Sequence, residues 1–267
     1  MEKEASSTDD PSSFTLLVSC PSGLSPSQVS VAFSDAYDRI PHSDVILENT
    51  ISEIWKQRSQ KNNSLFNGKK FRDFCGDKFK SFVGKVPDDS VLCQHTSNPL
   101  GNGAVVETND NKILVLQRSD NVGEFPGHFV FPGGHPEPQE IGITSHQYNK
   151  ELTESINTKV SQEMFDSIVR EVVEEIGVPA SSLSIPAFIG ISRRNLNVRP
   201  AAFFFIKCGL DSKEVRQFYS SAQDGYESTQ LYAVPMIEIE NMTSRMPGCH
   251  RGGFALYKLM VDTRKIT

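Results

Sequence analysis

The chain has 267 residues, of which 37% are hydrophobic and 22% are charged. This balance is typical of a globular protein and excludes a fibrous or largely disordered chain. Acidic residues outnumber basic ones by 33 to 27, so the formal net charge is −6 at pH 7, which argues against a protein that coats nucleic acid.

Cysteine usage and the N-terminal composition indicate the compartment. The five cysteines are odd in number and form no CxxC pair, which fits a reducing compartment better than a disulfide framework. Residues 1–13 are polar, without an apolar or arginine-rich targeting stretch, and we expect them to be a disordered lead. No apolar run is long enough to cross a membrane. We therefore expect a cytoplasmic protein with neither a membrane nor a nucleic-acid partner.

The first part of the chain predicts a small N-terminal α/β domain over residues 14–99. Residues 14–18 have the composition of a strand, and residues 25–33 are expected to form a short helix. A second, amphipathic helix is predicted over residues 46–58. The texture changes near residue 100, where two apolar runs flank a tight polar turn, so we place a domain boundary there.

The second part, residues 100–267, alternates strands with helices, which is typical of a layered α/β or α+β domain. Its strands are predicted at residues 101–107, 112–118, 129–131, 186–192, 201–207 and 230–234. Its helices are predicted at residues 165–176, 212–222 and 253–261.

The helix predicted over residues 165–176 has one apolar and one acidic face. Its acidic residues fall at positions i, i+3 and i+4, close enough to share a divalent cation, and they are Glu171, Glu174 and Glu175. Arg170 can reach Glu174, but one arginine cannot balance three carboxylates, whereas a hard cation such as Mg²⁺ or Mn²⁺ could. Such a string taken alone is more often a solvated surface, so the upstream sequence decides between the two interpretations.

A glycine turn lies upstream of this helix. The strand over residues 129–131 runs into Pro132, Gly133 and Gly134, which let the backbone turn tightly and approach a ligand closely. Glu140 follows the turn. A turn that only reverses the chain would explain the glycines but not the acidic helix that follows.

Together these two segments resemble the signature of the Nudix hydrolases. Gly134-x5-Glu140 matches its first half, and Arg170-Glu171-x-x-Glu174-Glu175-x-Gly177 matches its second half. The resemblance implies an α/β/α sandwich with a mixed β-sheet, preceded here by the small N-terminal domain. It also implies that the three glutamates hold Mg²⁺ or Mn²⁺ for catalysis, that one of them accepts a proton from water, and that Arg170 orients them.

The spacing between the two halves departs from the family. Residues 141–169 separate Glu140 from Arg170, far more than the family spacer. We expect the insert, residues 141–164, to loop out between the turn and the helix. This insert weakens the assignment of Glu140 to the site.

Further residues are candidates for contacts with the substrate. Gly133 and Gly134 allow close approach, and Glu227 is a candidate extra ligand or water-orienting base within a segment that matches one Nudix subgroup. A basic cluster follows the strand over residues 186–192 and is suited either to phosphate binding or to a solvated loop. It consists of Arg193, Arg194 and Arg199.

That subgroup acts on nucleotide sugars, so the resemblance implies hydrolysis of a small-molecule substrate such as UDP-glucose, UDP-galactose or GDP-mannose. The products would be a nucleoside monophosphate and a sugar 1-phosphate. Two alternatives stay open. One is a Nudix diphosphatase for ADP-ribose or another nucleotide, and the other is a non-catalytic nucleotide-sugar sensor.

Overall fold

The computed structural model describes the following parts of the chain: residues 12–34, 38–61, 70–71, 95, 98–122, 124–143, 153–220 and 228–266. Nearly all of the expected lead over residues 1–13 therefore lies outside the described residues, as does Glu227. Within the described ranges, no helix has the length and apolar character needed to span a membrane.

A seven-stranded mixed sheet forms the centre of the protein. Its strands run in the order β1-β5-β6-β2-β3-β4, and β7 also pairs with β3. Strands β2 and β6 are parallel, whereas the other pairs are antiparallel. The strands are β1 Phe14–Leu24, β2 Gly101–Glu107, β3 Ile113–Arg118, β4 Phe129–Val130, β5 Ala187–Arg194, β6 Pro200–Lys207 and β7 Ser228–Val234.

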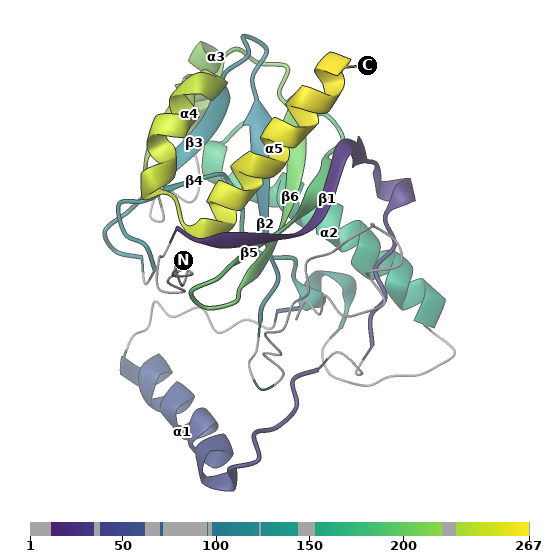
Figure 1. Cartoon of the computed structure of the whole chain (residues 1–267), viewed down its shortest axis with the longest axis vertical. Helices are drawn as coiled ribbons and strands as arrows, with labels where there is room; N and C mark the ends of the chain where they lie inside the picture. Colours follow the sequence, from purple (N-terminus) through teal and green to yellow (C-terminus); the bar gives the residue numbers. More distant parts are fainter. Residues whose placement is uncertain are drawn as a thin grey trace, which may run out of the picture.

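Helices cover both faces of this sheet (Figure 1). Helices α2 (Thr153–Ile176) and α3 (Ser212–Tyr219) pack on one face, and α4 (Met236–Met242) and α5 (Gly248–Ile266) pack on the other. The predicted α/β/α sandwich with a mixed sheet is confirmed. Helix α1 (Val45–Lys61) lies apart from the sheet at one end of the molecule (Figure 1).

Strand alternation divides the core into two apolar layers. In β6, Phe204 faces α2, and its neighbours Phe203 and Phe205 face α5. In the parallel partner β2, Ala104 and Val105 divide in the same way. Because both faces are covered, these strands are nearly continuous apolar runs.

Strand β1 corrects the predicted domain boundary. It pairs antiparallel with β5, with Thr15 opposite Arg193, and so belongs to the central sheet rather than to a separate unit that ends near residue 100. Its side chains Leu17 and Val18 are buried in the core beneath the sheet. An apolar strand gains most by completing a sheet edge, and the partner it needs is remote in sequence.

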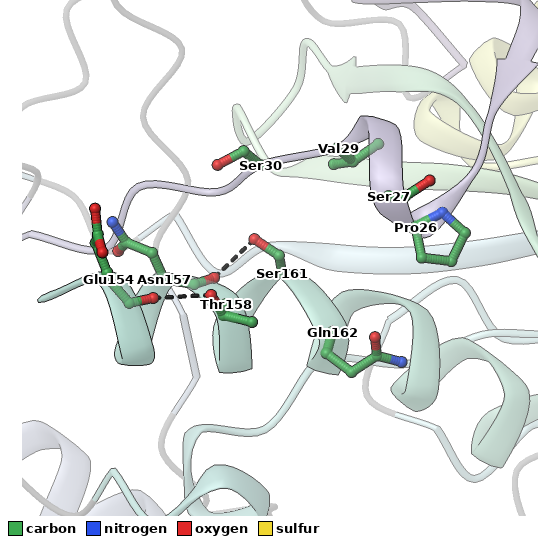
Figure 2. A pocket seen from close by; sticks show the side chains of 9 residues that line it. All are labelled: Pro26, Ser27, Val29, Ser30, Glu154, Asn157, Thr158, Ser161 and Gln162. Atoms are coloured by element: carbon green, nitrogen blue, oxygen red, sulfur yellow. Dashed lines mark hydrogen bonds between the residues drawn. The ribbon is translucent and has the colours of Figure 1, made fainter. Parts of the chain in front are cut away.

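The helix predicted directly after β1 is wrong apart from one 3₁₀ turn, Pro26–Gln28. Beyond this turn the chain runs along the beginning of α2 (Figure 2). The amide of Val31 donates to Ser161 Oγ and that of Phe33 donates to Asn157 Oδ1, both at 2.8 Å. These tertiary hydrogen bonds satisfy the backbone without a helix.

The insert between the two motif halves does not loop out as a whole. Helix α2 begins at Thr153 instead of residue 165, so residues 153–164 extend it, whereas residues 144–152 lie outside the described residues. Val160 and Met164 are buried at 3% and 6% exposure. They continue the apolar stripe of the helix toward its N-terminus, so sheet packing stabilises these turns.

Met164→Ala tests this extension. We expect a loss of about 2–5 kcal/mol in the free energy of unfolding, the range for removing a buried large side chain, measured by urea denaturation. Asp166→Asn on the exposed side of the same helix is the control and should stay within about 0.5 kcal/mol. Equal stability of the two variants would contradict the packing of residues 153–164 against the sheet.

Candidate active site

The glycine turn after β4 packs against the acidic face of α2. The amide of Gly133 donates to Glu175 Oε2 at 2.7 Å, and the amide of His135 donates to Glu171 Oε1 at 3.1 Å. Glu175 is 8% exposed, Glu171 is half-buried, and Glu174 is exposed. The two motif halves, although separated by the insert, therefore meet through direct hydrogen bonds.

Asn102 of β2 provides a third connection. Its side-chain Oδ1 accepts the backbone amide of Gly134 at 2.8 Å, and its backbone amide donates to the Gly134 carbonyl. Its side-chain Nδ2 donates to Ser167 Oγ on α2 at 2.8 Å. Asn102 and Ser167 are both buried. Sequence reasoning missed this pair, although a single asparagine within the apolar strand GNGAVVE was a signal.

Both glycines are required by close packing. A Cβ at Gly134 would lie 1.9 Å from Glu171 Oε1, and one at Gly133 would lie 2.2 Å from the Asn102 carbonyl oxygen. Neither distance is possible for a real side chain. The absence of side chains lets the backbone amides reach the carboxylates.

Arg170 pairs with Glu163 rather than with Glu174. Its Nη2 lies 2.6 Å from Glu163 Oε1 and its Nη1 lies 3.2 Å from Oε2, a bidentate pair. This hydrogen bonding to Glu163 raises the pKa of the Arg170 guanidinium above its ordinary value. Glu163 is missing from the sequence-based candidates because it lies in the expected loop-out.

Carboxylate oxygens are the donors that Mg²⁺ and Mn²⁺ prefer. Within the described ranges, no three His, Cys, Asp or Glu side chains are already placed to hold an ion together. The residues nevertheless fit a divalent cation in chemistry, because Glu171 and Glu175 share one face of α2 and the exposed Glu174 lies on the adjacent turn. A Cβ at Gly134 would collide with the Glu171 carboxylate, so the glycine allows this carboxylate to lie against the turn.

The predicted arginine cluster is divided between two environments. The side chain of Arg194 is 5% exposed, and its guanidinium bonds to Glu124 and Asn197 and lies 4.5 Å from the centre of the Phe125 ring. Arg199, 45% exposed, lies 2.9 Å from the other oxygen of Glu124. Arg194 is therefore committed to internal contacts, whereas Arg199 stays partly accessible.

Arg193 lies within the sheet, where its backbone is opposite Thr15 of β1 and Pro200 of β6.

Two cations influence His135, the residue that follows the two glycines. The pKa of His135 is lowered to about 3 by burial and by the charges of Lys70 and Arg199. Lys70 was absent from the predicted site, because it lies far along the chain from both motif halves.

A hollow lies between residues 26–30 and the first turns of α2 (Figure 2), and its lining residues include neither the glycine turn nor the three glutamates of the acidic face. Its lining is neutral except for Glu154. With no cation in the lining to attract phosphate, it does not replace the carboxylate face as the candidate site.

Comparisons with known proteins place this site in a family. No family model matches the chain. It is 57% identical over 291 residues to Nudix hydrolase 9 of Arabidopsis thaliana, covering 96% of this chain and 94% of that protein. It is 31% identical over 266 residues to the mouse uridine diphosphate glucose pyrophosphatase NUDT22, covering 85% and 83%.

A solved structure of a MutT protein from Methanosarcina mazei covers 63% of this chain and 95% of its own, with 18% identity and a TM-score of 0.40. The sequence similarity to these two relatives shows that the protein is a hydrolase. It belongs to the Nudix hydrolase family, as the resemblance of its two motif halves predicted.

Proposed function

We propose that this protein hydrolyses the diphosphate bond of a nucleoside diphosphate sugar, with Mg²⁺ or Mn²⁺, to a nucleoside monophosphate and a sugar 1-phosphate. The observation that carries the proposal is the pair of hydrogen bonds joining the glycine turn to Glu171 and Glu175. The name of the mouse relative, a UDP-glucose pyrophosphatase, supports the substrate class.

Glu171, Glu174 and Glu175 would hold the cation. When bound, it supplies Lewis-acid neutralisation of the diphosphate oxygens and eases the deprotonation of water. Its charge also offsets the repulsion among three carboxylates on neighbouring helical turns. Such an arrangement suits an anionic substrate in an otherwise acidic protein.

The protein's own groups would position the reaction. One of the three glutamates accepts the proton of the attacking water, since a carboxylate within hydrogen-bond reach serves as a general base. The amides of Gly133 and His135 fix the rotamers of Glu175 and Glu171. This fixation reduces the reorganisation required in the transition state.

Arg199 and Lys70 would attract the diphosphate toward the turn. Arg199 is the more accessible of the two arginines bound to Glu124, and its charge acts on His135 within the turn. Guanidinium groups bind phosphate oxygens in bidentate geometry. Arg193, Arg194 and Glu227 remain proposed substrate contacts from the sequence, with the internal bonds of Arg194 weighing against a direct contact.

A substrate panel with product identification tests this function. With Mg²⁺, UDP-glucose, UDP-galactose or GDP-mannose should give a higher kcat/KM than ADP-ribose, NADH or diadenosine polyphosphates. The reason is that pocket groups bonded to sugar hydroxyls and base are left unsatisfied by the wrong ligand.

Nucleoside monophosphate and sugar 1-phosphate are the expected products. ADP-ribose as the best substrate would assign the protein to another Nudix class. No turnover of any compound with Mg²⁺ or Mn²⁺ would contradict catalysis and favour a nucleotide-sugar sensor.

A further inference from the structure

We infer that Glu163, a residue outside both motif halves, is the positioning residue that holds Arg170 and the glycine turn in register with the carboxylate face. This inference rests on the proposed function, because it concerns the geometry of the same site. Glu163, rather than Glu140 of the first motif half, provides the carboxylate that pairs with Arg170.

The contacts of Glu163 reach both parts of the site. Its two oxygens form the bidentate pair with Arg170, and Oε1 also accepts the backbone amide of Glu137 at 2.9 Å. Glu137 follows Gly134 by three residues, and Arg170 directly precedes Glu171. One carboxylate therefore ties the chain after the turn to the helix position next to the first acidic residue.

Burial makes these contacts strong. The side chain of Glu163 is 2% exposed, whereas that of Arg170 is 37% exposed. A buried carboxylate is stable only when paired and hydrogen-bonded, and the three bonds to Glu163 meet this requirement. A charged and bidentate pair also constrains orientation more tightly than a single neutral bond.

Glu140 does not occupy this place. It lies in the 3₁₀ turn Pro138–Ile141 and is exposed. Helix α2 starts early enough to present Glu163 two turns before Arg170, on the same side of the helix. The additional turns of α2, residues 153–164, therefore provide the carboxylate that pairs with Arg170.

The test compares three carboxylate-to-amide changes, Glu163→Gln, Glu140→Gln and Asp166→Asn. Asp166 is an exposed residue on the same helix and serves as the matched control. We expect Glu163→Gln to lower kcat for the best substrate about tenfold to a hundredfold, the usual range for a group that orients metal ligands.

KM for the substrate should change less than about threefold, because Glu163 does not contact it. The Mg²⁺ concentration for half-maximal activity, and the dissociation constant for Mn²⁺ measured by electron paramagnetic resonance without substrate, should each rise about tenfold. The other two variants should stay within about twofold of the unaltered protein in all these quantities.

A purely structural role predicts a different pattern. Glu163→Gln would then lower the melting temperature but leave kcat and the Mn²⁺ dissociation constant unchanged at temperatures where it is folded, which would overturn the inference. A loss in Glu140→Gln that matches or exceeds the loss in Glu163→Gln would also overturn it.

If Glu163→Gln does not fold, the double variant Glu163→Gln with Arg170→Met removes both charges and leaves neither stranded. Its folded form should show the same rise in Mn²⁺ dissociation constant. Normal Mn²⁺ binding by the double variant would contradict a positioning role.

Metal binding also separates this inference from the proposed function. If the unaltered protein binds Mn²⁺ but cleaves no substrate in the panel, the proposed function is wrong. In that case weaker Mn²⁺ binding by Glu163→Gln would still support the positioning role. If the unaltered protein binds no Mn²⁺, both proposals fail.

Discussion

Glu174→Gln is expected to lower kcat for the proposed nucleotide-sugar hydrolysis by about a hundredfold or more, because it removes a charge that we propose holds the cation. Glu174 is exposed, so the free energy of unfolding without metal should stay within about 0.5 kcal/mol of the unaltered protein. Steady-state kinetics at several Mg²⁺ concentrations and urea denaturation measure the two effects.

Glu175→Gln should cause a similar loss of kcat. The amide oxygen of glutamine can still accept the Gly133 amide that Glu175 now accepts, and removing a charge relieves repulsion within the acidic cluster. Stability of the metal-free protein should therefore hold or rise slightly. Glu154→Gln, the same change at an exposed position of α2, is the control for both variants. Near-normal kcat in both site variants would show that the metal assignment is wrong.

Gly134→Ala is expected to lower kcat about a hundredfold with a smaller effect on stability. The new Cβ would lie 1.9 Å from Glu171 Oε1, so the carboxylate must leave its position beside the turn. The displaced atoms are at the end of a side chain, which moves more easily than backbone. A displacement of about 1 Å in a catalytic group can cost about a hundredfold in rate.

Two further alanine variants make this result specific. Gly133→Ala would place its Cβ 2.2 Å from a backbone oxygen of Asn102, so it should lower the melting temperature more than Gly134→Ala does. Gly209→Ala, with its Cβ at an ordinary 3.6 Å from the Ser182 carbonyl oxygen, should leave kcat and the melting temperature unchanged. Unchanged kcat in Gly134→Ala would refute the role of the glycine turn in positioning Glu171.

The acidic helix and the glycine turn were predictable from the sequence because their signals are local. Spacing of i, i+3 and i+4 places Glu171, Glu174 and Glu175 on neighbouring turns in any α-helix. Consecutive glycines likewise indicate close backbone approach wherever they occur. The family and the sandwich fold followed from these two segments together with the alternation of strands and helices.

The extent of α2 was not predictable to the same degree. The apolar stripe through Val160 and Met164 is interrupted by polar residues, and the match to a known motif favoured a loop in that region. The contacts that stabilise these turns come from the sheet and from the extended chain after β1, whose amides bond to Ser161 and Asn157. Helical propensity alone carries too little free energy to decide the matter.

The sequence by itself determined which residues carry charge, which face of α2 is acidic and where the backbone can turn. Tertiary structure decided that β1 completes the central sheet, that Arg170 pairs with Glu163, and that Asn102 joins the turn to α2. The physical reason is that a local pattern specifies geometry over a few residues. The partner of a buried charge or strand edge is instead selected by burial, often among groups far apart in the chain.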